Sequence, residues 1–378
     1  MSGLPDFRLE VHLGRWEFAA RHHLTASDAE SLSVAEVLGD EGLAELGTLR
    51  LGYTPTWGTD PLREAVAATY AEVAPDDVLV FAGAEEAMFW ALQELVGPGE
   101  HAIVTVPNYQ SMETVTLGTG AAVSGLPLDP ARGWALDLDL LASLLRPETR
   151  LVAVNFPNNP TGAVPDPGTF RALVALCEQR GVRLFSDEVY RGLEARPESA
   201  LPQAADLSPT ALSLGVMSKA YGLPGLRIGW LACRDRALLG RLETRKHYTS
   251  ICSSAPSELI ATAALRRGAE IRARNRAIID ANLPVFAAFF AEWPGLFAWA
   301  PPQAGCVCFP RYLGDDGVET FCRELVEQAG VVLLPASIFA SALAPVPADR
   351  FRIGVGRAAP EPALAALADF LRSRAAGG

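Results

Sequence analysis

The sequence predicts an α/β protein: a three-layer α/β/α domain built on a mainly parallel sheet, with a smaller α+β domain beside it. Two observations predict the large domain. Between about residues 51 and 233, short apolar runs that end in Gly, Pro, Asn or Asp alternate with amphipathic segments. These runs are continuous, which is typical of strands covered by helices on both faces. A change in amino-acid composition predicts the small domain, because the chain after residue 233 becomes rich in Ala, Leu and Arg.

Each expected strand of the large domain is a short apolar run, and each expected helix is an amphipathic segment. The expected strands are Val78–Phe81, Ala102–Val106, Leu151–Phe156, Val182–Phe185, Ala211–Val216 and Ile228–Cys233. The expected helices are Pro61–Val73, Ala84–Leu95, Leu138–Leu145 and Pro167–Arg180. Asp166-Pro167 and Thr59-Asp60-Pro61 are typical of capped helix starts with proline in the first turn.

The chain after residue 233 predicts long helices and a few short strands. The expected helices are Arg234–Tyr248, Ser257–Phe290, Val318–Gln328 and Pro360–Ala375, and the expected strands are Gly305–Phe309 and Phe351–Val355. We therefore expect a large domain over residues 46–255 and a small domain over residues 256–378. The N-terminal segment, residues 1–45, is expected to join the small domain.

Composition places the chain among globular proteins and narrows its partners. Hydrophobic residues make up 49% of the 378 residues, and the net charge is −12. The acidic balance argues against nucleic acid or an anionic membrane as a partner. The chain does not open on a basic segment followed by an apolar run, and its apolar stretches are shorter than a membrane span. Six cysteines without metal-ligand spacing predict free thiols, no metal site and a cytoplasmic location.

Lys219 is the first candidate for chemistry. Together with Ser218 it follows the expected strand 211–216 and precedes a glycine-rich turn. A buried ammonium group is costly at this place, and an imine to an aldehyde cofactor removes that cost. Taken alone, Lys219 is better explained as a surface lysine. The cofactor interpretation therefore depends on the residues expected around it.

Two features predict a seat for a phosphate group. Arg227 lies eight residues after Lys219 beside glycines, and the fork of its guanidinium suits a phosphate. Gly83-Ala84-Glu85 ends one strand and opens a helix, whose free backbone amides attract an anion.

Three further strand ends carry groups that suit a ring with a phenolate oxygen and a pyridine nitrogen. Asn159, in the turn-rich segment 155–162, can donate to the oxygen, with a cis bond to Pro160 as a hypothesis. Asp187 can pair with the nitrogen, Tyr190 can donate to the oxygen and Tyr109 can stack on the ring. The open alternatives are a plain loop for the segment 155–162 and a core tyrosine for Tyr109.

Ligands of α/β sheets lie at the carboxyl ends of the strands, where these residues are expected to meet. An aldehyde, a phosphate, a pyridine nitrogen and a phenolate oxygen are the polar groups of one cofactor. The sequence therefore predicts a site for pyridoxal 5′-phosphate.

Seven motifs resemble those of the fold type I pyridoxal-phosphate enzymes, the class I/II aminotransferase superfamily. They are YTPTWGTDPLR, FAGAEEA, PNYQS, NFPNNPTG, SDEVY, SKAYGLPGLRIGW and FRIG, in this order from about residue 50 to residue 357. The resemblance implies a Schiff base between the cofactor and Lys219. It also implies that Lys219 is the acid and base at the α-carbon of an L-amino acid.

The resemblance implies roles for the other cofactor-binding candidates. Asp187 is expected to pair with the pyridine nitrogen, Asn159 and Tyr190 to hold the ring oxygen, and Tyr109 to stack on the ring. The phosphate is expected to bind the backbone amides of Ala84 and Glu85 and the side chains of Ser218 and Arg227.

The remaining implied roles concern the substrate and a second subunit. Arg352, with Asn159, is expected to bind the α-carboxylate of the substrate. The family implies a homodimer with shared sites, in which Tyr53 reaches the phosphate of the other subunit. The N-terminal segment is expected to close over the site.

The chain departs from the commonest family pattern in three places. Val216 replaces a serine that many relatives use for the phosphate. Glu85 stands where many have Ser or Thr, so its carboxylate points near the phosphate or toward the substrate; we hypothesise that it faces a cationic substrate side chain. The usual N-terminal turn is replaced by a segment with His22 and His23, which line the site or lie at a surface or a domain seam.

The sequence is similar to a branch of the family that contains capreomycidine-synthase-like cyclases and lyases of specialised metabolism. The expected activity is that of an aminotransferase. The alternative is a lyase or cyclase that eliminates or replaces a group at Cβ or Cγ, on a hydroxylated arginine-like or S-conjugated cysteine-like substrate. A regulator with an aminotransferase-like sensor domain is disfavoured, because a basic DNA-binding module does not fit before Tyr53.

Overall fold

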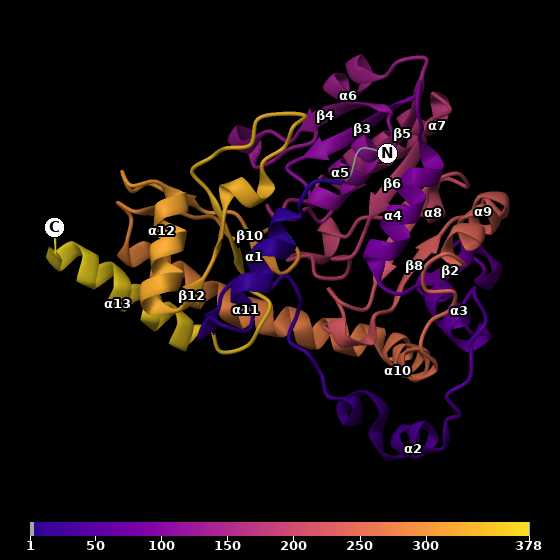
Figure 1. The fold of residues 1–378 in the computed structure, drawn as a ribbon, viewed down its shortest axis with the longest axis horizontal. Coiled ribbons are helices and arrows are strands. Elements are labelled where there is room, and N and C mark those ends of the chain that lie inside the picture. Colours follow the sequence, from indigo (N-terminus) through magenta and orange to yellow (C-terminus); the bar gives the residue numbers. More distant parts are fainter. Residues whose placement is uncertain (1–3, 378) are drawn as a thin grey trace.

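A seven-stranded sheet forms the centre of the computed structural model, which describes residues 4–377 (Figure 1). Its strands are β2 (Val78–Phe81), β3 (His101–Val106), β4 (Ala122–Pro127), β5 (Thr149–Asn155), β6 (Arg183–Asp187), β7 (Leu212–Val216) and β8 (Gly229–Ala232). Their order is β2-β8-β7-β6-β5-β3-β4, and only β8 runs antiparallel to its neighbours. This confirms the predicted mainly parallel sheet.

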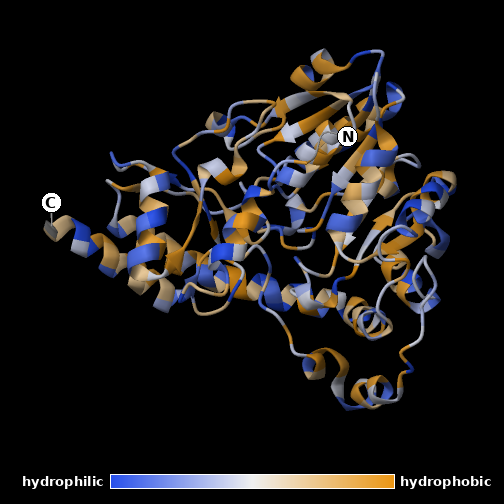
Figure 2. Ribbon diagram, in the orientation of Figure 1, coloured by the Kyte–Doolittle hydropathy of each residue, from blue (hydrophilic) through white to orange (hydrophobic). Residues whose placement is uncertain are grey.

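Helices cover both faces of this sheet, so its strands are apolar. Every residue of β2, β3, β7 and β8 is buried, and the strands are largely orange in Figure 2. The helices of this part are α3 (Asp60–Ala67), α4 (Ala84–Leu95), α5 (Gln110–Gly118), α6 (Leu138–Leu144), α7 (Pro167–Gln179), α8 (Ala204–Leu207) and α9 (Arg236–Lys246). The predicted three-layer α/β/α architecture is thereby confirmed.

The helix starts agree with the prediction at one place and differ at another. The side chain of Asp166 caps α7 by accepting hydrogen bonds from the backbone amides of Gly168 and Thr169. Thr59 occupies the predicted N-cap position of α3, with proline in the first turn, but its side chain forms no capping bond. Its backbone amide instead donates to the buried carboxylate of Glu258, at 2.8 Å.

Two predicted helices needed correction, and one strand was not expected. The helix expected over 61–73 ends at Ala67, and the one expected over 257–290 is two helices, α10 (Ala255–Arg266) and α11 (Gly268–Glu292). The break lies at Arg267, whose backbone (φ −99°, ψ 15°) is not helical. Strand β4 was not expected, because this edge strand has only one fully buried residue.

The C-terminal part contains short sheets packed on helices. Strands β10 (Val307–Cys308), β14 (Phe351–Gly354) and β13 (Leu334–Pro335) form one sheet, and β9 (Phe297–Ala298) pairs with β11 (Arg311–Tyr312). Helices α12 (Val318–Glu324) and α13 (Glu361–Gly377) lie beside them, and α11 runs from this part toward α10 (Figure 1). The predicted smaller α+β part is confirmed, whereas the domain boundaries near residues 45 and 255 stay a prediction.

The N-terminal segment is shared between the two parts. It contains α1 (Arg8–Trp16), β1 (His22–His23) and α2 (Val34–Thr48). Strand β1 pairs in parallel with β12 (Val331–Val332) of the C-terminal part. In Figure 1, α1 lies between the sheet and the C-terminal helices, and α2 lies below α10 at the edge of the molecule.

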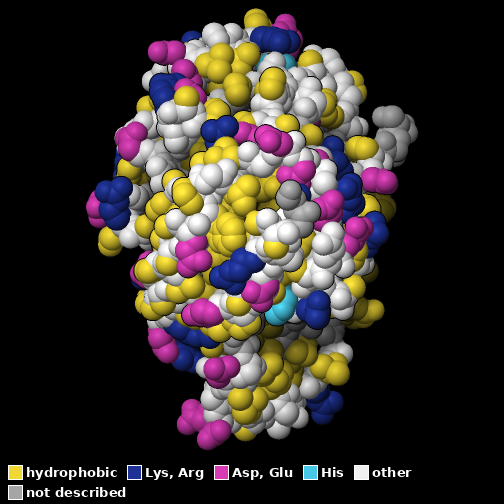
Figure 3. Space-filling model, turned by 90° about the vertical axis from the view of Figure 1, so that its left-hand side faces the viewer, with side chains coloured by type: hydrophobic (Ala, Val, Ile, Leu, Met, Phe, Trp, Pro, Cys, Tyr) yellow, Lys and Arg dark blue, Asp and Glu magenta, His cyan; other side chains and the backbone are white. Residues whose placement is uncertain are grey.

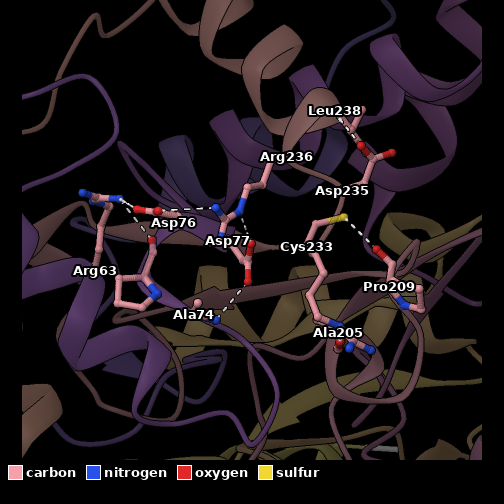
Figure 4. A network of polar contacts seen from close by, with 12 residues as sticks. Arg63, Ala74, Asp76, Asp77, Ala205, Pro209, Cys233, Asp235, Arg236 and Leu238 are labelled. Carbon is pink, nitrogen blue, oxygen red and sulfur yellow. Dashed lines mark hydrogen bonds and ion pairs between the residues drawn. The ribbon is translucent and has the colours of Figure 1, made fainter.

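Charged side chains lie mainly on the surface. Figure 4 shows Arg236, at the start of α9, bound to Asp77 at 2.8 Å and to Asp76 at 3.4 Å, just before β2. This pairing attaches α9 to the sheet edge but is half exposed, so it adds little stability. On the face seen in Figure 3, acidic, basic and hydrophobic side chains are interspersed. Among residues 4–377, no helix is long and apolar enough to cross a membrane.

Gly354 is predicted to be essential for seating the N-terminal segment. A Cβ at this position would lie 2.0 Å from the carbonyl oxygen of Ala26. Gly354→Ala should therefore displace the segment and cost about 1–3 kcal/mol of unfolding free energy. Thermal melting and the rate of trypsin cleavage after Arg21 measure the two effects.

Gly47→Ala is the matched control, because Gly47 lies in α2 with no atom within 4 Å of the added Cβ. It should leave stability unchanged or raise it by up to about 1 kcal/mol. Equal melting temperatures and cleavage rates for the two variants would contradict the steric role of Gly354.

Candidate active site

A cavity of about 730 Å³ lies at the carboxyl ends of the central strands. Ten residues predicted from the sequence line it: Ala84, Glu85, Tyr109, Asn159, Asp187, Tyr190, Ser218, Lys219, Arg227 and Arg352. They come from strand ends and loops far apart in the sequence. The structure therefore brings together the predicted set, with one exception.

The exception is Tyr53. Its side chain is 95% exposed, and it does not line the cavity of its own chain. Leu51, two residues earlier, is also 82% exposed. The expected contact of Tyr53 with a second subunit stays a prediction.

Lys219 lies at the wall of the cavity, in the loop after β7. Burial lowers the pKa of its amine, and the positive charge of Arg352 lowers it further. Its Nζ donates a hydrogen bond to Oγ of Ser27, at 2.8 Å. The lysine is thus held as an amine with a reduced proton affinity, which suits a nucleophile or base.

Asp187 and Tyr190 carry polar groups that are poorly satisfied. Asp187, the last residue of β6, is 4% exposed, and burial raises the pKa of its carboxyl to about 7. One of its oxygens accepts from the backbone amide of Val189, at 3.2 Å. The hydroxyl of Tyr190 is buried and forms no hydrogen bond with the residues that the structure describes. Both groups point to a polar ligand, because unpaired buried polar atoms are costly.

Asn155, at the end of β5, organises the loop that carries Asn159. Its side-chain oxygen accepts from the backbone amide of Asn159 at 2.7 Å, and its side-chain nitrogen donates to the carbonyl of Asp187 at 3.1 Å. The Asn159–Pro160 peptide bond is cis, as hypothesised. Asn155 is a site residue that the sequence reasoning did not single out, although it belongs to the quoted NFPNNPTG motif.

Arg352, on β14, is a buried guanidinium, 1% exposed. It donates to the side-chain oxygen of Asn159 at 3.0 Å and to the carbonyl of Thr25 at 2.9 Å, and it lies 5.5 Å from the ring centroid of Phe339. Its Nε has no hydrogen-bond partner within residues 4–377. The bond to Asn159 leaves the amide nitrogen of that side chain available to a ligand.

The turn from β2 into α4 and the side chain of Arg227 form one end of the site. Gly83 adopts φ +95°, and a Cβ there would lie 2.6 Å from a terminal nitrogen of Arg227. A Cβ on Gly229 would lie 2.6 Å from the backbone of Gly83. The glycines thus allow Arg227 to approach the N-terminus of α4, where an anion is favoured.

Three glutamates, Glu10, Glu17 and Glu85, line the cavity as well. Burial raises the pKa of Glu85, whose carboxylate accepts a hydrogen bond from the hydroxyl of Ser111. Glu10, on α1, accepts from the hydroxyl of Tyr109 at 3.3 Å. Glu10 was not predicted, because its place depends on how the N-terminal helix packs over the cavity.

The N-terminal segment supplies further cavity residues that sequence reasoning missed, namely Ser27 and Asp28. Asp28 forms an ion pair with Arg357, at 3.0 Å. Of the two histidines in β1, His23 lines the cavity and His22 does not. The imidazole of His23 contacts the carbonyl of Glu17 within its own segment. The only signal for these positions was that the segment departs from the family pattern.

Comparison with known proteins identifies the family. The model of aminotransferase class I and II matches residues 24–371. Capreomycidine synthase from Streptomyces vinaceus is 32% identical to this chain, covering 100% of it and 96% of the relative. Arginine–pyruvate transaminase from Pseudomonas aeruginosa is 28% identical, covering 80% of this chain and 77% of the relative.

Solved structures agree with this result. A pyridoxal-phosphate-dependent aminotransferase from Streptococcus suis is 30% identical, with a TM-score of 0.91 over 99% of both chains. The pyridoxal-phosphate-dependent cyclase OrfR is 29% identical, with a TM-score of 0.89 over 99% of both chains. The chain is therefore an enzyme of the aminotransferase class I and II family, and its cofactor is pyridoxal 5′-phosphate.

Proposed function

We propose that Lys219 carries the cofactor and that the enzyme acts at the α-carbon of an L-amino acid, as an aminotransferase. The observation that supports this most is the set of groups around one cavity. Asp187 would pair with the pyridine nitrogen, Asn159 and Tyr190 would hold the ring oxygen, and Tyr109 would stack on the ring. Ser218, Arg227 and the backbone amides of Ala84 and Glu85 would hold the phosphate, and Arg352 the substrate carboxylate.

The poorly satisfied groups of the cavity fit this cofactor. The unpartnered hydroxyl of Tyr190 matches a phenolate oxygen, and the buried carboxyl of Asp187 matches a protonated pyridine nitrogen. The approach of Arg227 to the start of α4 matches a phosphate. Val216 lines the cavity without a hydroxyl, so the phosphate would rely on the other donors.

When bound, the cofactor supplies an aldehyde for amines and a ring that accepts electron density from the substrate. The protein supplies positioning and proton transfer. Arg352 fixes the carboxylate, and Asn159, held by Asn155, fixes the orientation of the ring oxygen. Burial lowers the pKa of Lys219, so its neutral amine can remove the proton from Cα of the substrate and later return a proton to another atom.

A lyase or cyclase is the second candidate. Capreomycidine synthase aligns over the full length of this chain, and the cyclase OrfR over 99% of it. The N-terminal segment, which departs from the usual aminotransferase pattern, lines the cavity with Ser27 and Asp28. Lys219, Asp187 and Arg352 serve either reaction, so the fate of the electrons at Cα depends on the groups around them.

We also propose that the substrate has a cationic side chain. Arg227 serves the phosphate, Arg352 the α-carboxylate, and Arg357 pairs with Asp28, whereas three glutamates of the cavity, Glu10, Glu17 and Glu85, have no cation assigned to them. Glu10 and Glu85 are each bound only to a hydroxyl. A guanidinium or ammonium group would satisfy both carboxylates. Its methylene stem would pack on the apolar lining residues Leu9, Leu13 and Met88.

A homodimer in the cytoplasm completes the proposal. The exposure of Leu51 and Tyr53 supports the homodimer, because exposed large apolar groups mark association surfaces. The division into an N-terminal segment (1–45), a large domain (46–255) and a small domain (256–378) is proposed with it. Strand β1, which pairs with β12, supports the assignment of the first segment to the small domain.

Asp187→Asn is predicted to stabilise the cofactor-free enzyme at pH 8 and to change little at pH 5. The unfolded carboxyl is charged from about pH 4 upward, whereas the folded one has a pKa of about 7. Stability is therefore lost as the pH rises between these values, and asparagine removes the loss. Thermal melting of cofactor-free samples at both pH values measures it.

The cofactor-bound form should respond in the opposite direction. There Asp187→Asn removes one member of a buried charge pair and should lower kcat/KM by at least about 100-fold. Unchanged melting at pH 8 together with unchanged kcat/KM would contradict the proposed role of Asp187.

The reaction type is tested by incubating the enzyme with single amino acids and following the absorbance of the bound cofactor. An aminotransferase converts the cofactor to its amine form, releases a keto acid and is restored by a second keto acid. A lyase or cyclase releases a group from Cβ or Cγ without accumulating the amine form. Lys219→Ala should lose either activity, and full activity of that variant would refute the proposed role of the lysine.

Glu85→Gln and Glu10→Gln test the substrate class. Each change should lower kcat/KM for arginine-like substrates by about 10- to 100-fold, because a hydrogen bond to a charged group is lost. Neutral amino acids of similar length should react at unchanged rates. Glu64→Gln, on the exposed face of α3, is the matched control. Unchanged preference in both cavity variants would rule out a cationic side chain at this position.

A further inference from the structure

Ser27 is a cavity residue to which the mechanism above gives no role. Its hydroxyl accepts a hydrogen bond from Nζ of Lys219, although the two residues lie 192 positions apart in the chain. The backbones nearby are joined too, because the amide of Ala29 donates to the carbonyl of Lys219 at 3.2 Å. The N-terminal segment thus contacts the lysine through both a side chain and the main chain.

The segment 24–30, which carries Ser27, is fixed on both sides of it. The carbonyl of Leu24 accepts from Gly354 at 2.8 Å, and the carbonyl of Thr25 accepts from Arg352 at 2.9 Å. On the other side, the amide of Glu30 donates to Gly356 at 2.9 Å, and Asp28 pairs with Arg357. The position of the Ser27 hydroxyl is therefore set by the fold.

Charged groups surround Lys219, but none of those described forms a hydrogen bond with its amine. Arg352 on β14 lowers the pKa of the amine, whereas Asp28 of the N-terminal segment, Cys306 and Asp187 on β6 raise it. Ser27 is the hydrogen-bond partner that the described residues give to Nζ. A hydroxyl can accept from an ammonium group and can donate to a neutral amine, so it can hold the lysine in both protonation states.

We propose that Ser27 is a positioning residue, which holds the amine of Lys219 at the N-terminal side of the cavity whenever that amine is not attached to the cofactor. The inference rests on the proposed function, in which the free amine moves a proton at Cα. A partner that fits both protonation states guides the amine without trapping it in one of them. The segment that covers the cavity thereby also sets the place from which the lysine acts.

The test uses cofactor-free enzyme, so it does not depend on catalysis. The chain has two lysines, Lys219 and Lys246, and Lys246 is fully buried. Trinitrobenzene sulfonate reacts with neutral amines, and peptide mass spectrometry separates the two sites. The ammonium form gains more from the bond to Ser27 than the neutral amine does, because hydrogen bonds to charged groups are stronger. Ser27→Ala should therefore lower the pH midpoint for labelling Lys219 by about half to one unit. Labelling of Lys246 should not change.

Two further variants keep the test independent of folding. Ser27→Thr retains the hydroxyl and should restore the wild-type midpoint. Ser33→Ala removes a hydroxyl that caps α2 outside the cavity and should not shift it. In the cofactor-bound enzyme, Ser27→Ala should lower kcat by about ten-fold with little change in KM. Ser27→Thr should recover most of that loss.

An unchanged midpoint in folded Ser27→Ala, or a shift of equal size in Ser27→Thr, would overturn the proposal. Failure of the proposed function looks different. In that case Lys219→Ala retains activity or amino acids leave the cofactor absorbance unchanged, whereas the labelling of cofactor-free enzyme still reports the contact between Ser27 and Lys219.

Discussion

The buried guanidinium of Arg352 holds the three parts of the chain together at the cavity. It comes from β14 of the C-terminal part and binds Asn159 of the sheet part and the carbonyl of Thr25 in the N-terminal segment. A buried charge is tolerated only when its donors are paired. Two of its nitrogens have partners in the protein, whereas Nε has none among residues 4–377. The same group that joins the parts is thus the one that we propose to bind the carboxylate of the substrate.

Close approach of backbones makes this arrangement possible. Gly354 and Gly356 lie against the main chain of the N-terminal segment, where a Cβ would come within 2.0 Å of Ala26 and 2.5 Å of Asp28. Gly83 does the same for Arg227 at the opposite end of the cavity. Glycines at these points let the Arg227 side chain and the N-terminal segment lie where a Cβ would otherwise clash with them.

The sequence could predict the sheet and ten of the residues that line the cavity, because both depend on local signals. Continuous apolar runs mark β2, β3 and β5 to β8, and cavity residues lie at or shortly after the carboxyl ends of β2, β3, β5, β6 and β7. The edge strand β4 was not predicted, because its partly exposed residues do not form a continuous apolar run. Ser27, Glu10 and Arg357 escaped for another reason: their places in the cavity arise from contacts between distant segments, which no local pattern records.

The cavity residues that were not predicted come largely from the N-terminal segment, on which we propose that the reaction outcome depends. The N-terminal segment supplies Glu10, which lines the cavity and is proposed to bind a substrate side chain, and Ser27, which contacts Lys219. Asp28 and Arg357 attach the same segment to the strand that carries Arg352. A shift of this one segment would therefore alter side-chain recognition, carboxylate binding and the position of the lysine together. Within a shared fold and a shared cofactor, changing this segment is a direct physical route from one reaction at Cα to another.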